Sequence, residues 1–119
     1  MLVNIVLSGI LIVQTLPLLT DTEQKELSRA RQLVADCRQP DRPRPDWIAA
    51  GHCLGYLEGY IEGYETATLA CPVPPGVNIE QIRQIFFRYM DRHPEHLHEP
   101  ARFMLLAALF EAYPDWTCR

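Results

Sequence analysis

Proline placement is the feature that most constrains what this chain can fold into. The chain has ten prolines in 119 residues, and most of them are gathered in two short segments, 40–45 and 72–75. A proline breaks the hydrogen-bond ladder of a helix and has no N–H to donate within a central strand. Together with the later prolines at 94, 100 and 114, the two proline-rich segments divide the chain after residue 20 into four segments long enough to form a helix: 21–37, 46–70, 78–93 and 100–113.

All four segments are predicted to be helices, and none alternates apolar and polar residues as a strand does. Segment 21–37 starts at Asp21 or Thr22, whose side chains can cap a helix. Segment 100–113 is apolar on nearly every side, which is typical of a helix buried at the centre of a bundle. Because short links favour antiparallel neighbours, we predict an all-α fold, a small antiparallel four-helix bundle.

Segment 78–93 indicates both where its helix begins and which side is buried. Asn78 and Gln81 have the spacing of a capping box. An apolar side chain then recurs every three or four residues, which predicts one buried face. The arginines expected on the opposite, solvent-facing side are Arg83, Arg88 and Arg92.

The chain carries four cysteines after residue 20: Cys37, Cys53, Cys71 and Cys118. They form no C-x-x-C pair, so the spacing of a zinc ribbon or a thioredoxin is absent. An even number of cysteines in so small a domain favours two disulfides and an oxidising compartment. In the antiparallel bundle, the first helix ends near the start of the second, and the fourth ends where the second does. We therefore predict the pairs Cys37–Cys53 and Cys71–Cys118.

The first 20 residues form a separate apolar segment, and no charge occurs before Asp21. The apolar run is too short to span a bilayer and has the length of a signal-peptide core. We expect a signal peptide at residues 1–20; the alternatives are a retained anchor and an ordinary buried helix. Residues 21–119 then form a single helical domain without stable membrane insertion.

Segment 46–70 carries a glycine at every fourth position. Residues four apart share a helix face, so a glycine groove lies beside a ridge of tyrosines. Each interior glycine costs about 1 kcal/mol relative to alanine, which close approach of another helix would offset. That helix belongs either to the same bundle or to a second chain. The residues of this packing face are Gly51, Gly55, Tyr56, Gly59, Tyr60 and Gly63.

Histidines gather between the third and fourth segments, where His93, His96 and His98 alternate with Glu95 and Glu99. A proline interrupts this stretch, and no H-E-x-x-H spacing puts two ligands on one helix face. We therefore expect no metal here, but a turn rich in capping and hydrogen-bonding groups.

The candidate catalytic groups are few. Glu58, Glu62 and Glu65 form a row on segment 46–70, which is typical of a solvated helix face, and paired cysteines leave no thiol nucleophile. We expect neither an enzyme nor a cofactor. The net charge of −4 also argues against nucleic acid as a partner, because such proteins present basic surfaces.

Several short motifs occur in a characteristic order. They are Cys53-Leu54-Gly55-Tyr56 with Gly59, Cys71-Pro72, Pro75-Gly76-Val77 with Gln81, Tyr89 with His93-Pro94-Glu95, and then His98, Ala101 and Ala108-Leu109. In this order and spacing, the chain resembles the Rap/Tai family, the immunity proteins of bacterial type VI secretion systems. The resemblance covers residues 30–118 and departs from the family where Tyr113-Pro114 is followed by three residues before Cys118.

The resemblance implies a periplasmic, often homodimeric, helical protein that binds a toxin and blocks its active-site cleft. The toxin, or effector, is frequently a peptidoglycan-cleaving amidase. A small periplasmic stress protein or acid-type chaperone of similar build is the alternative. The candidate contacts with the effector are Glu58, Glu62, His93, Glu95, His96 and His98.

Overall fold

The computed structural model describes residues 20–22, 25 and 28–116, and the expected leader therefore lies almost wholly outside them. The named elements, in chain order, are α3 (Ala30–Cys37), the 3₁₀ turn η1 (Gln39–Asp41), α4 (Trp47–Thr68), α5 (Ile79–Arg92), the 3₁₀ turn η2 (Pro94–His96) and α6 (Ala101–Ala112). Within the described ranges there is no strand, only an isolated bridge between Arg29 and Pro100. The all-α prediction is confirmed.

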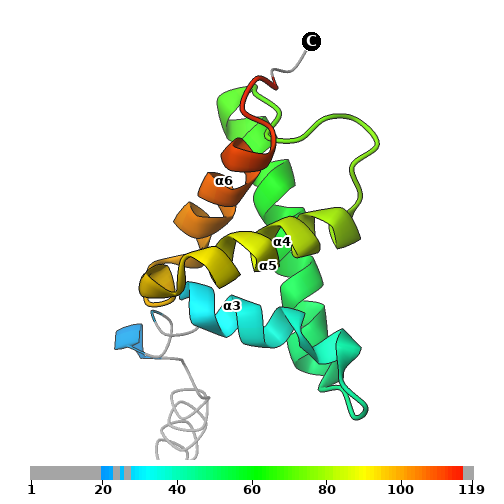
Figure 1. Cartoon of the computed structure of the whole chain (residues 1–119), viewed down its shortest axis with the longest axis vertical. Coiled ribbons are helices and arrows are strands. Elements are labelled where there is room, and N and C mark those ends of the chain that lie inside the picture. The colour runs from blue at the N-terminus through cyan, green and yellow to red at the C-terminus, as the bar shows by residue number, and fades with distance from the viewer. Residues whose placement is uncertain (1–19, 23–24, 26–27, 117–119) are drawn as a thin grey trace, which may run out of the picture.

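The helices cross one another rather than standing in a regular bundle. In Figure 1, α4 (green) is the longest helix, α3 (cyan) and α5 (yellow) lie across it, and α6 (orange to red) rises beside its upper half. Helices α4 and α6 run in the same direction. Arg102, near the start of α6, interacts electrostatically with Tyr56, and Phe110, near the end of α6, contacts Tyr64, which lies further along α4. The predicted antiparallel bundle is not confirmed.

Local sequence signals account for the ends of α4 and α5. The Asp46 carboxylate caps α4 by accepting hydrogen bonds from the Ile48 and Ala49 N–H groups at 3.0 and 3.2 Å. At the other end, Leu69 adopts the left-handed conformation that commonly terminates helices. Helix α5 begins with the predicted capping box between Asn78 and Gln81, both of whose hydrogen bonds are 2.9 Å long.

The predicted helix over residues 21–37 is interrupted at Ser28 and Arg29: residues 21, 22 and 25 are helical, and α3 begins at Ala30. Ser28 and Arg29 leave the helical conformation, and the backbone there pairs with the segment before α6. The Ala101 N–H donates to the Ser28 carbonyl at 2.7 Å, and the Ala30 N–H donates to the Glu99 carbonyl at 2.8 Å. These long-range hydrogen bonds replace the local ones that a continuous helix would make.

The core is a single cluster to which all four helices contribute. Its largest fully buried side chains include Leu33 of α3, Leu57 of α4, Phe86 of α5 and the pair Leu105 and Leu109 of α6. Burying each side chain of this size contributes about 1.5–3 kcal/mol, so this cluster is the main source of stability.

Helix α6 is not the buried centre that its composition predicts. It buries the face of Ala101, Leu105, Ala108 and Leu109, whereas Phe103 and Phe110 are about half exposed, at 53% and 47%. This second apolar side is covered only in part by the described residues, where Tyr64 meets Phe110 and Arg102 lies over the Phe103 ring. The helix therefore has one buried apolar face and one half-exposed apolar face.

Arg83 does not face solvent, although the apolar periodicity of segment 78–93 predicts that it does. Its side chain is 5% exposed, and it donates hydrogen bonds to the Cys37 carbonyl at 2.6 Å and to the Asp41 carboxylate at 2.8 Å. A third partner, the Glu80 carboxylate, accepts at 2.8 Å from within α5. A buried guanidinium needs such partners, and they come from α3 and η1, which helical periodicity does not reveal.

The disulfide Cys37–Cys53 is confirmed and links the end of α3 to the first turns of α4. Asp36 and His52 directly precede the two cysteines and are also paired. The His52 imidazole is hydrogen-bonded to the nearly buried Asp36 carboxylate. The second predicted pair, Cys71–Cys118, has one member outside the described residues and stays a prediction.

Candidate functional site

The glycines of α4 lie on an open surface. A side-chain carbon added at Gly51, Gly55, Gly59 or Gly63 would meet no described residue within 4 Å. Of the two alternatives for this face, packing against another helix of the same chain finds no support among the described residues, and packing against a second chain stays a prediction. The groove faces solvent, and the exposed apolar side chains Trp47 and Ile48 precede it at the start of α4.

The tyrosine ridge is directed toward the protein instead. Tyr56, Tyr60 and Tyr64 stack in sequence, with ring centroids 6.3 and 6.4 Å apart, and the edge of Phe110 meets Tyr64. Tyr56 and Tyr60 also pack against the core. Burial raises the pKa of both phenols, and the neighbouring tyrosine adds to the rise. The predicted glycine–tyrosine face is thus two faces, of which only the glycine groove is open.

An open cavity of about 580 Å³ lies between the second half of α4 and the proline-rich loop that follows it. Glu58, Glu62 and Glu65 line one wall, and an apolar surface that includes Ile61 and Ile82 lines the rest. Two predicted contact residues, Glu58 and Glu62, therefore share a concave, acidic site, which we name the acidic cavity.

Sequence reasoning missed the opposite wall of the acidic cavity. That wall includes the loop from Val73 to Val77 together with Trp116, whose buried indole N–H has no hydrogen-bond partner among the described residues. The three prolines at 72–75 predict a stiff connection, but they do not indicate that it folds back over α4. Only the tertiary structure supplies that information.

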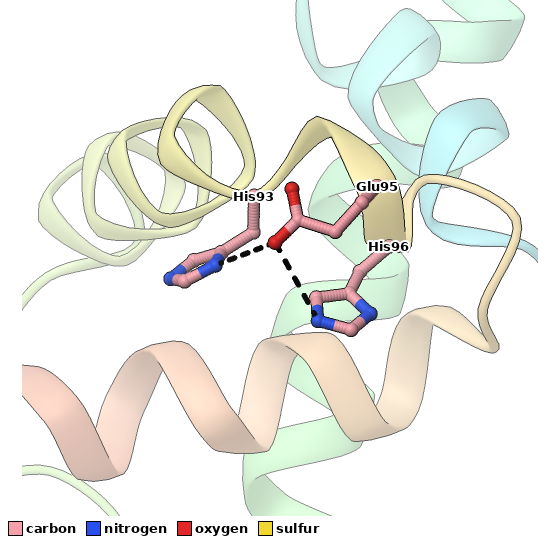
Figure 2. Close-up of side chains that lie close together, drawn as sticks. All are labelled: His93, Glu95 and His96. Atoms are coloured by element: carbon pink, nitrogen blue, oxygen red, sulfur yellow. Dashed lines mark hydrogen bonds and ion pairs between the residues drawn. The ribbon is translucent and has the colours of Figure 1, made fainter.

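The histidine-rich turn forms a second, separate group at the other end of α5. In Figure 2 the Glu95 carboxylate lies between the two imidazoles of His93 and His96. Glu95 Oε1 is 3.2 Å from His93 Nδ1 and 3.8 Å from His96 Nε2. His98 stands apart from this trio and pairs with Glu99 at 3.3 Å.

The electrostatics of this turn favour an ionised carboxylate. A hydrogen bond from its own backbone N–H, and then one from His93, lower the pKa of Glu95. Glu95 is therefore negatively charged over a wider pH range than an ordinary glutamate. The predicted contact residues are not one site, since Ile79 at the start of α5 lines the acidic cavity and His93 ends that helix.

None of the helices in the described ranges has the combination of length and apolar character that crossing a membrane requires. The structure thus defines a class of protein: a small, disulfide-linked, all-α chain whose distinctive groups lie on its surface. The model of one known family, the Rap1a immunity proteins, matches residues 29–115. The chain belongs to this family, which confirms the resemblance seen in its motifs. Searches of curated proteins and of solved structures found no match.

Proposed function

We propose that this chain is an immunity protein that binds and neutralises a type VI secretion effector in the periplasm. Membership of the Rap1a immunity protein family carries the proposal. The disulfide Cys37–Cys53 supports export, because such bonds persist in oxidising compartments. A peptidoglycan-cleaving amidase is the effector we propose, since the periplasm is where its substrate is reached.

The acidic cavity is the effector contact that the structure favours most. It combines a concave apolar surface with three carboxylates from one helix, Glu58, Glu62 and Glu65. Such a site is complementary to a protruding segment that has a lysine or arginine beside apolar residues. The turn with His93, Glu95, His96 and His98 is the second candidate contact. It lies about 20 Å along α5 from the cavity, given the rise of 1.5 Å per residue.

We also propose that a second copy of the chain covers the glycine groove of α4. Four open glycines cost helix stability that no contact among the described residues offsets. Close approach of the same helix from a partner would offset that cost and bury the exposed Trp47 and Ile48. Immunity function would then reside in a homodimer.

Binding to the effector tests the proposal and its site together. The product of the neighbouring gene is titrated with the wild-type chain and with a Glu58→Gln, Glu62→Gln double variant. We expect the double variant to bind at least about tenfold more weakly, equivalent to about 1.4 kcal/mol.

The matched control is Asp91→Asn, which removes an exposed carboxylate near the far end of α5. We expect it to bind like the wild type. Tight binding by the double variant would exclude the acidic cavity, and absence of binding by the wild-type chain would exclude this effector as the partner.

A further inference from the structure

The 3₁₀ turn η2 places three side chains with metal-binding atoms together on the surface. One nitrogen from each of His93 and His96 and one Glu95 carboxylate oxygen all lie within 4.8 Å of one another. We propose that these three residues form a binding site for a divalent transition-metal ion of the zinc class. This inference concerns the isolated chain and goes beyond the proposed immunity function.

Turn geometry explains why the ligands converge although no helical metal motif is present. In a 3₁₀ conformation, side chains three residues apart eclipse each other. His93 precedes the turn and His96 ends it, so their imidazoles lie on the same side with Glu95 between them (Figure 2). The helical spacing of four residues is not needed here.

The distances between the ligand atoms suit tetrahedral coordination of a zinc ion. Zinc lies about 2.0–2.2 Å from nitrogen and oxygen ligands, which places the ligand atoms of a tetrahedral site about 3.3 Å apart. The two contacts of Glu95 Oε1, at 3.2 Å to His93 Nδ1 and 3.8 Å to His96 Nε2, lie on either side of that value. Small side-chain rotations would complete the geometry.

The turn is held in place without a metal. The His96 N–H donates to the His93 carbonyl at 3.0 Å, and the His93 ring packs on Tyr89 with centroids 4.5 Å apart. The Arg31 N–H donates to the Leu97 carbonyl at 2.9 Å and ties the turn to α3. Because the backbone is already ordered, metal binding would carry a small entropic cost.

The donor set selects the class of ion. Two imidazoles and one carboxylate suit zinc and its neighbours, whereas Ca²⁺ and Mg²⁺ prefer sites made of oxygen ligands. Side chains that are 35–60% exposed leave room for water, or for a donor from a partner protein, at the fourth position.

Isothermal titration of the full chain, prepared without a histidine tag, with zinc chloride tests the site. We expect saturable binding of one ion per chain and no saturable binding of Ca²⁺ or Mg²⁺. Glu95→Gln and His96→Gln should each weaken zinc binding by at least about tenfold, since three protein ligands are needed for a tight site. Circular dichroism at 25 °C would verify that both variants remain helical.

His98→Gln is the matched control, because it removes a histidine of the same loop that lies outside the trio. It should bind zinc as the wild type does. The proposal is overturned if the wild-type chain shows no saturable zinc binding, if Glu95→Gln and His96→Gln bind normally, or if His98→Gln is weakened as much as they are. No effector is present, so these outcomes are independent of the proposed immunity function.

Discussion

Cys37 is the residue at which three helices meet. Its sulfur is bonded to Cys53 of α4, and its carbonyl accepts a hydrogen bond of 2.6 Å from Arg83 of α5. The guanidinium that makes this bond also contacts the Phe87 ring, 5.3 Å from its centroid. One covalent bond and one charge-assisted hydrogen bond therefore fix the end of α3 against both neighbours.

Replacing the buried arginine should destabilise the protein. In Arg83→Met the Cys37 carbonyl loses its partner in the interior, whereas Asp41 and Glu80 are mostly exposed and regain water. We expect a loss of about 2 kcal/mol in the free energy of unfolding, measured by urea denaturation. The exposed Arg88→Met should change it by less than about 0.5 kcal/mol. Equal losses would show that burial of Arg83 has no special role.

The ion pair of Glu80 should make stability depend on pH in the acid range. Hydrogen bonds from Arg83 and then from Gln84 lower the pKa of Glu80 from 4.5 to about 2. A lowered folded-state pKa stabilises the fold above the unfolded-state value, and this contribution is lost as pH falls from 4.5 towards 2. Urea denaturation across this range should therefore show a smaller acid loss in Glu80→Gln than in wild type.

The Arg83→Met background provides the control for that measurement. Without the guanidinium, the effect of Glu80→Gln on the acid loss should largely disappear. An effect of the same size in both backgrounds would mean that another group causes the pH dependence.

At the scale of elements, local signals predicted α4 and α5 well, and long-range contacts decided the rest. The Asp46 cap and the Asn78–Gln81 capping box are encoded within one helical turn, and both are present. The start of α3 is set by pairing with residues 97–101, nearly seventy positions away in the chain, which periodicity does not detect. The half-exposed Phe103 and Phe110 show likewise that an apolar residue need not be buried.

The candidate site, too, was predicted from the sequence only in part. The sequence indicated Glu58, Glu62 and the histidine-rich turn as surface groups, and that much was readable from spacing along a helix. The sequence did not indicate that the loop from Val73 to Val77 closes a cavity over the glutamates. Nor did it reveal that a 3₁₀ turn brings His93 and His96 together, because that depends on backbone conformation.

Gly59→Ala should separate the stability of a single chain from its self-association. The added methyl group meets no described residue within 4 Å, so the monomer should gain about 1 kcal/mol from helix propensity. In a homodimer joined through the glycine groove, the same methyl should weaken association. Urea denaturation and analytical ultracentrifugation measure the two effects.

Gly76→Ala is the control for the stability effect of Gly59→Ala, because we expect it to change stability in the opposite direction. Its φ of +86° is strained for any other residue, so Gly76→Ala should destabilise the chain although space is open there too. A Gly59→Ala chain with wild-type self-association would contradict a dimer formed through α4.

At the scale of the whole molecule, the disulfide should be a principal source of stability for so small a chain. It closes a loop with a sequence separation of 16. Removing it in a Cys37→Ser, Cys53→Ser double variant should cost about 3 kcal/mol in the chain-entropy model. Thermal denaturation followed by circular dichroism measures this loss, and a change within error would contradict it.

Peptide mapping of the non-reduced protein tests the remaining cysteine prediction. We expect one peptide pair joined through Cys37 and Cys53, as in the structure, and a second joined through Cys71 and Cys118. A peptide in which Cys71 carries a free thiol would contradict the predicted second disulfide.

The central claim is that this member of the Rap1a immunity proteins protects its host from an effector. The most direct measurement is growth of bacteria in which the product of the neighbouring gene is directed to the periplasm, with and without this chain. The account predicts that the effector arrests growth and that co-expression of the exported chain restores it. Growth arrest that persists despite verified periplasmic accumulation of this chain would contradict the account.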